Sequence, residues 1–162
     1  MTAHPTVTLV TCKSMPNLFK GEEGLLDELA ARGCDPQIKV WNDPDVDWSE
    51  AGMVVVRSVS DYASDRPAFL EWTKQLRRVQ NSTDVLNWNT DKHYLKELAA
   101  LGLPTIPTNW LEPEQNLSKH QIHTRFPASG EFIVKPAVSS GVRDIGRYTT
   151  VSTSQRQAAI AQ

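Results

Sequence analysis

The sequence lacks the features that define several large classes of protein. Its 162 residues contain two cysteines, Cys12 and Cys34, whose spacing suits neither a zinc site nor a disulfide framework. We therefore expect both to be small apolar side chains in a reducing compartment. No apolar run approaches the roughly 20 residues of a membrane span. The N-terminus, MTAHPTVTLVT, has neither the charged segment nor the long apolar segment of a signal peptide, so we predict a cytoplasmic protein without a membrane partner.

A strong charge imbalance is also missing. Seventeen basic residues stand against nineteen acidic ones, a formal net charge of -2, so no surface for nucleic acid is indicated. The sequence contains no G-x-G-x-x-G, G-x-S-x-G or H-E-x-x-H motif, which excludes the common dinucleotide, hydrolase and zinc-protease fingerprints. Gly141 and Gly146 have the spacing of a phosphate-binding P-loop, but Arg147-Tyr148 stands where lysine and a hydroxyl residue are required.

The first half of the chain alternates strand and helix patterns. Apolar and β-branched runs predict strands over 6–11, 38–41, 53–56 and 84–86. Leucines at helical spacing predict a helix over 21–32 that ends at Gly33, with Glu22 and Glu23 in its first turn. A second helix begins at Pro67. This alternation with short connections is typical of an α/β domain with a parallel sheet.

Arg57 stands at the carboxyl end of a predicted strand, directly after four apolar residues. Ligands of parallel sheets bind at the carboxyl ends of strands. This rule places the loop after Thr11 and the segment 57–62 beside a cleft, where the Arg57 guanidinium would clamp a substrate carboxylate. A surface ion pair or a bridge between domains explains Arg57 equally well, and the sequence leaves these interpretations open.

The second half contains a predicted hairpin with a cationic loop. Strands are predicted over 132–134 and 147–151, and Pro136 ends the first because it has no backbone donor. The loop contains Lys135, the small turn Ser139-Ser140-Gly141, and Arg143. Backbone N–H groups in such a loop can cradle phosphate oxygens while the lysine and arginine supply positive charge. The alternative is an ordinary exposed hairpin.

The order of these motifs resembles that of the ATP-grasp ligases of the glutathione-synthetase-like type. The resemblance rests on VVVRS at 54–58, Asp61-Tyr62, NWNTDK at 87–92 and the segment 132–148. It is strongest toward the actinobacterial branch that includes the cyclo-ligase of cycloserine biosynthesis. It implies that Lys92 and Lys135 bind ATP phosphates and that Arg57 orients the substrate carboxylate. The residues that would close over the triphosphate are Ser139, Ser140, Gly141 and Arg143, with Arg143 in a catalytic role.

The resemblance also implies a domain organisation and a reaction. Residues 1–88 would form a Rossmann-like pre-ATP-grasp domain, and residues 89–162 the first part of an ATP-grasp domain, truncated before its Mg²⁺ ligands. The activity would be ATP-dependent ligation of a small carboxylate to an amine or another nitrogen nucleophile through an acyl phosphate. The alternative is a non-catalytic nucleotide-binding or scaffold domain derived from that fold. An incomplete second domain would leave an unpaired strand edge, which favours a homodimer.

Overall fold

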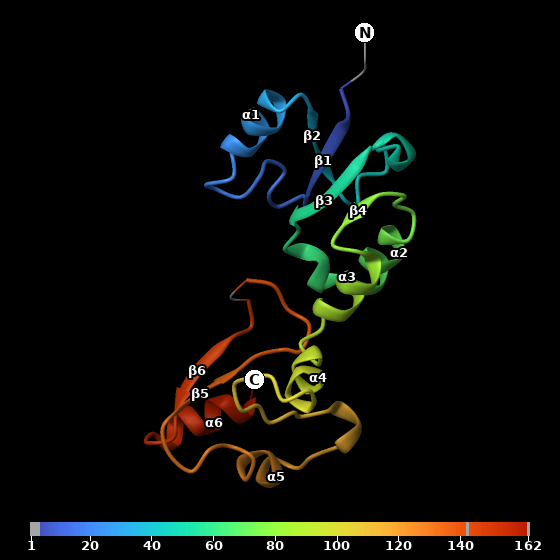
Figure 1. Cartoon of the computed structure of the whole chain (residues 1–162). Helices are drawn as coiled ribbons and strands as arrows, with labels where there is room; N and C mark the ends of the chain where they lie inside the picture. Colours follow the sequence, from blue (N-terminus) through green and yellow to red (C-terminus); the bar gives the residue numbers. More distant parts are fainter. Residues whose placement is uncertain (1–3, 142, 162) are drawn as a thin grey trace. The chain divides into compact units, whose positions relative to one another are not determined.

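The computed structural model describes residues 4–141 and 143–161, and the chain divides into two units, Met1–Asp91 and Lys92–Gln162 (Figure 1). Each unit contains its own sheet. No helix among the described residues is long and apolar enough to cross a membrane.

A four-stranded parallel sheet forms the centre of the first unit. Its strands are β1 (Thr6–Thr11), β2 (Asp35–Val40), β3 (Met53–Ser58) and β4 (Val79–Gln80). Their order is β2-β1-β3-β4, and every neighbouring pair is parallel. The helices are α1 (Gly24–Ala31), α2 (Arg66–Thr73) and α3 (Thr83–Asn89), with short 3-10 turns at Trp48–Glu50 and Asp61–Ser64. The predicted α/β class with a parallel sheet is confirmed.

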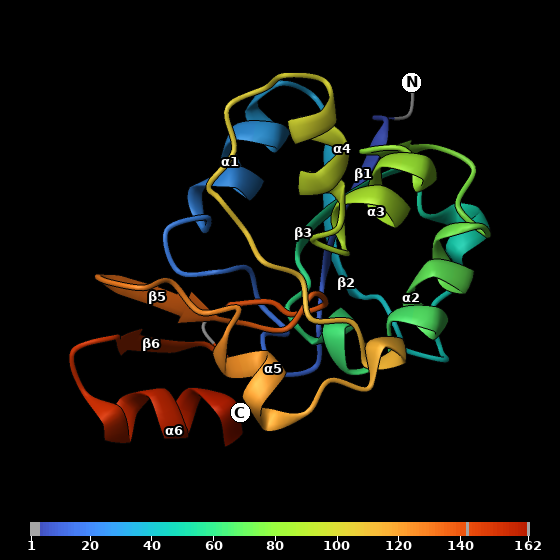
Figure 2. The same ribbon diagram turned by 90° about the horizontal axis from the view of Figure 1, so that it is seen from below.

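Helices cover both faces of this sheet. The side chains of β1 alternate between the two faces, so each face has apolar side chains to bury. Val7 and Leu9 pack in one apolar cluster with the leucines of α1. Val10 belongs to a second cluster with Phe69 and Trp72 of α2. Figures 1 and 2 show α1 and α2 on opposite sides of the strands. Both faces of β1 are therefore buried, and its sequence, TVTLVT, with five β-branched residues of six, suits such a strand.

The fourth strand lies earlier in the chain than predicted. The prediction placed it at 84–86, but those residues belong to α3 and the strand is Val79–Gln80. Asn81 turns the chain with a φ of 51°. The Ser82 hydroxyl then caps α3 by accepting from the Val85 N–H at 3.3 Å. The prediction was wrong because two apolar residues after Asp84, Val85 and Leu86, do not distinguish a strand from one helical turn.

The order of the strands creates a switch point between β1 and β3. The chain leaves β1 through α1 toward β2 on one side, and leaves β3 through α2 toward β4 on the other. Open α/β sheets bind ligands at such a point, outside the carboxyl ends of the strands. The end of β3 lies there beside the loop that follows β1, since the Phe19 N–H donates to Ser58 Oγ at 3.0 Å.

The second unit is built on an antiparallel hairpin. Strands β5 (Glu131–Val134) and β6 (Gly146–Thr149) pair with Phe132 opposite Tyr148, which confirms the predicted hairpin. The ring of Phe132 lies between those of Phe126 and Tyr148, with centroid distances of 4.7 and 5.7 Å. The other elements are α4 (Tyr94–Ala100), a 3-10 turn (Pro113–Gln115), α5 (Lys119–His123) and α6 (Thr153–Ala161).

Candidate functional site

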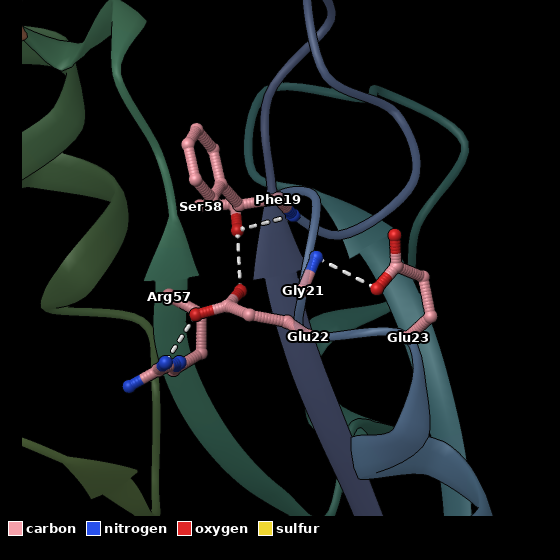
Figure 3. Close-up of polar contacts among 6 residues, drawn as sticks. All are labelled: Phe19, Gly21, Glu22, Glu23, Arg57 and Ser58. Atoms are coloured by element: carbon pink, nitrogen blue, oxygen red, sulfur yellow. Dashed lines mark hydrogen bonds and ion pairs between the residues drawn. The ribbon is translucent and has the colours of Figure 1, made fainter.

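A carboxylate from the loop before α1 pairs with Arg57 at the carboxyl end of β3 (Figure 3). Arg57 Nη2 forms an ion pair with Glu22 Oε1. The second oxygen of this carboxylate, Oε2, accepts from the Ser58 hydroxyl at 2.9 Å. The Arg57 side chain is 46% exposed and that of Glu22 21%. The Arg57 side chain is therefore accessible to water, while most of the Glu22 side chain is covered. We refer to Glu22, Arg57 and Ser58 as the β3-end cluster; the substrate role of Arg57 stays a prediction.

Ser58 is the buried member of this cluster. It is 6% exposed, and its oxygen accepts from the Phe19 N–H while its proton is donated to Glu22. A hydroxyl with its proton and an acceptor position both engaged has a fixed orientation. Sequence reasoning missed Ser58, although it ends the same strand as Arg57 and is the next residue in the chain.

Glu22 also has a different position from the one expected. The sequence pattern placed Glu22 and Glu23 in the first turn of a helix, but α1 begins at Gly24, so that prediction was wrong. Glu23 Oε2 accepts from the Gly21 N–H at 2.7 Å, and Glu22 is left in the loop where it reaches β3. No sequence signal links Glu22 to Arg57, because the two are 35 residues apart and only the fold brings them together.

Cys12 and Ser60 lie at the same end of the sheet. The Cys12 Sγ atom is 3.3 Å from Ser14 Oγ and 3.7 Å from Ser60 Oγ. Burial raises the pKa of the Cys12 thiol, but the hydrogen bonds with Ser14 and Ser60 outweigh it, and the pKa lies below its ordinary value. Asp61 Oδ1 accepts from Trp41 Nε1 at 2.7 Å, which joins the ends of β2 and β3. Both cysteines are free thiols, as the sequence predicts.

Lys92 holds the loop between β5 and β6. Its ammonium donates to the carbonyl oxygens of Pro136 and Ala137 at 3.0 and 3.2 Å. It also donates to the carbonyl oxygen and the hydroxyl of Ser139, at 3.2 and 2.6 Å. The backbone N–H of Lys92 donates to Ala137 O at 2.9 Å. Because an ammonium has three donors, the loop oxygens occupy the positions that phosphate oxygens would need.

Lys135 and Arg143 differ from Lys92 in their surroundings. Both are exposed, and neither side chain has a hydrogen-bond or ion-pair partner within residues 4–141 and 143–161. Between them, Ser140 is half-buried, and Gly141 has a φ of 67°, which a residue without Cβ adopts readily. Val142, also part of the predicted phosphate loop, lies outside the described residues. The described part of the loop thus presents two cations to solvent.

A polar cluster supports the start of α4. Glu112 Oε1 lies 3.1 Å from His93 Nε2 and 2.6 Å from Lys96 Nζ. The Trp110 ring stacks on His93 with centroids 4.4 Å apart, and Lys96 Nζ lies 4.8 Å from its centroid. The hydrogen bond from Lys96, more than the one from His93, lowers the pKa of Glu112 below its ordinary value. These contacts fix the helix that begins just after Lys92.

Magnesium ligands are not gathered in the described part of the chain. No group of three or more His, Cys, Asp or Glu side chains there could hold a metal ion. Because Mg²⁺ prefers several oxygen ligands in octahedral geometry, the residues present do not fit it. Magnesium stays an implication of the resemblance.

The sequence and the fold are similar to those of known proteins. Residues 7–87 match the family of the D-cycloserine synthetase DcsG N-terminal domain. The chain belongs to this family. It is 32% identical over 129 residues to the cycloserine biosynthesis protein DcsG of Streptomyces lavendulae, covering 76% of this chain and 43% of that protein. The crystal structure of D-cycloserine synthetase DcsG superposes with a TM-score of 0.79 at 29% identity, covering 95% of this chain and 52% of that one. The chain thus spans about half the length of these relatives.

Proposed function

We propose that this chain is the substrate- and phosphate-binding part of an ATP-grasp-type ligase of the cytoplasm. Membership of the DcsG N-terminal-domain family is consistent with ligase chemistry. The observation that carries the ATP-binding part of the proposal is the loop between β5 and β6. It exposes two cations that have no partner among the described residues, Lys135 and Arg143, while Lys92 fixes the loop.

The loop residues then have distinct roles in the proposed phosphate site. Phosphoryl transfer depends mainly on positioning and on neutralising the charge of the phosphates. Lys135 and Arg143 can meet a triphosphate without giving up an internal contact, and Ser139 to Gly141 supply backbone N–H groups. Lys92 shapes the loop. For Lys92 to contact phosphate directly, as the resemblance implies, a phosphate oxygen must replace one of its loop acceptors, such as the Ser139 hydroxyl.

The proposed reaction has two steps. A carboxylate oxygen attacks the γ-phosphorus of ATP, the bond to the bridging oxygen breaks, and ADP leaves with that electron pair. A nitrogen nucleophile then attacks the acyl carbon, loses a proton and displaces inorganic phosphate. Arg57 would hold the carboxylate in the orientation required for the first step. A nitrogen in the same molecule gives a ring, and a nitrogen in a second molecule gives peptide or amino-acid ligation.

Calorimetric titration of the chain with ATP and magnesium tests this proposal. We expect saturable binding that is weakened at least about tenfold by Lys135→Ala, because the variant removes one charge-assisted contact to phosphate. Lys119→Ala is the matched control, since Lys119 is an exposed lysine of the same unit outside the loop. Equal affinity of the Lys135→Ala variant and the unaltered chain would refute the phosphate site. No binding at millimolar ATP would favour the scaffold alternative.

A further inference from the structure

One carboxylate in the first unit has the surroundings of a bound ligand. The two oxygens of Glu22 are engaged by different donors, the Arg57 guanidinium and the Ser58 hydroxyl. A guanidinium with an oriented hydroxyl is a donor set that recognises a carboxylate by both charge and geometry. The hydroxyl belongs to a residue that is 6% exposed, and its own oxygen already accepts from the Phe19 N–H. The donors are therefore built into the fold before any partner arrives.

The donors and their acceptor differ in how firmly the fold holds them. Arg57 and Ser58 end β3, and there Ser58 pairs with Thr11 of β1. Glu22 lies on the loop between β1 and α1. In that loop the Phe19 side chain is 59% exposed, and a Cβ at Gly21 would meet nothing within 4 Å. The first part of the loop is anchored, since Leu18 is buried and the Phe19 N–H donates to Ser58, so release of Glu22 requires a change of its side-chain rotamer and no opening of the whole loop. Glu22 can leave its partners while they stay in place.

The cluster also occupies the part of the sheet where a ligand is expected. It lies at the switch point between β1 and β3, at the carboxyl end of the strand. We propose that the end of β3 is a binding site for small carboxylates and that Glu22 is its internal competitor. A carboxylate ligand displaces Glu22 and takes its two contacts, with Arg57 and with Ser58. This inference rests on the proposed function, to which it adds a second ligand-binding residue and a competing side chain.

Glu23 provides a matched control for Glu22. Both are glutamates of the same loop, so the change to Gln removes the same charge at nearly the same place. Within the described part of the chain, the Glu23 carboxylate accepts from the nearby Gly21 N–H alone, whereas Glu22 is bonded to the end of β3. If loop charge alone weakens anion binding, the two variants should therefore increase the acetate affinity equally. Only Glu22→Gln also removes the carboxylate that competes with the ligand for Arg57 and Ser58.

Titration with acetate, followed by NMR of the full ¹⁵N-labelled chain, tests the inference. The Phe19 amide reports the site because it donates to Ser58, and the Gly21 amide reports the Glu23 contact. We expect Glu22→Gln to bind acetate about fivefold more tightly than the unaltered chain, the scale of a tethered, partly exposed ion pair. Glu23→Gln should change the affinity by less than about twofold. Adding Ser58→Ala to Glu22→Gln should remove part of the gain.

Equal acetate affinity in Glu22→Gln and the unaltered chain, or an equal gain in Glu23→Gln, would overturn the inference. If Glu22→Gln does not give a dispersed spectrum, Glu22→Asp replaces it, because the shorter side chain draws the carboxylate away from Arg57. Arg57→Gln in the Glu22→Gln background should abolish acetate binding. If the double variant still binds acetate, Arg57 has no part in carboxylate binding and the proposed function loses its substrate-binding residue. If acetate binding requires Arg57 but is unchanged by Glu22→Gln, only the competing role of Glu22 is refuted.

Discussion

The role of Lys92 can be separated from that of Lys135 by one substitution at each position. Lys92→Met keeps the unbranched apolar stem and removes the ammonium that donates to Pro136, Ala137 and Ser139. These acceptors belong to the loop between β5 and β6, so we expect the loop to loosen without any nucleotide present. Lys135→Met removes an exposed ammonium that has no side-chain partner among the described residues, so the loop should keep its order.

The magnitude follows from the hydrogen bonds of the ammonium. A hydrogen bond to a charged group contributes about 1.5–3 kcal/mol net, and such values do not add for groups that share a donor. Three N–H donors serve four oxygens here, and the contacts are only partly buried. We therefore expect Lys92→Met to reduce the local stability of the loop contact by about 3 kcal/mol. This corresponds to an increase on the order of 100-fold in the open population.

Hydrogen exchange at the backbone amide of position 92 measures this opening, because that amide donates to Ala137 O at 2.9 Å. Exchange should be on the order of 100-fold faster in Lys92→Met and unchanged in Lys135→Met. ATP affinity should fall in both variants, for different reasons. If Lys92→Met left exchange unchanged while ATP affinity fell, Lys92 would be a phosphate ligand alone and the loop-holding role would be refuted.

Two further substitutions test the packing that supports these sites. Glu112→Gln should lower the thermal stability of the second unit at neutral pH. Since the folded state lowers the pKa of this carboxyl, the difference from the unaltered chain in thermal scans should be complete above about pH 4.5 and vanish as the pH falls through the lowered pKa. Gly52→Ala should cost at least 3 kcal/mol in urea unfolding, because Gly52 has a φ of 67° and a Cβ would lie 2.3 Å from Thr6 O. Gly33→Ala, with a φ of 76° and a nearest atom at 3.6 Å, should cost only about 1–2 kcal/mol, and equal losses would contradict the steric argument.

Much of the first unit follows from its sequence periodicity. Residues 6–11 form β1 as predicted, because a β-branched apolar run with buried positions on both faces has few alternatives to a central parallel strand. Gly33 ends α1 as predicted, with a φ of 76°. The failure at α3 has a local cause: Asn81 and Ser82 form a turn and a cap whose effect exceeds the strand preference of the apolar residues after them. Sequence periodicity therefore predicts elements such as β1, whose structure is determined by burial. It fails for elements such as α3, whose structure is determined by a turn and an N-terminal cap.

The candidate sites were predictable to a different extent. Arg57 could be placed because the length of an apolar strand fixes where its polar end emerges. Its partner Glu22 could not, since a contact across 35 residues depends on how the loop after β1 folds back onto β3. The acceptors of Lys92 could not be predicted either, because they are 44 to 47 residues away and are mostly backbone oxygens. Every residue has a backbone oxygen, so residue types do not indicate which of them accepts.

The β3-end cluster and the Lys92 site differ in the charge of the internal acceptors that a ligand would replace. At the β3-end cluster the acceptor is itself a carboxylate, so exchange of Glu22 for a substrate carboxylate leaves the charge beside Arg57 unchanged. The free energy of this exchange depends on geometry and on the solvation of the released side chain, which favours ligands that reproduce both contacts. At Lys92 the acceptors are neutral carbonyls and a hydroxyl. A phosphate bound there would add negative charge to a loop that contains Lys135 and Arg143, so long-range attraction would contribute directly. The end of β3 is therefore suited to selecting a substrate by shape, and the loop between β5 and β6 to attracting a highly charged one.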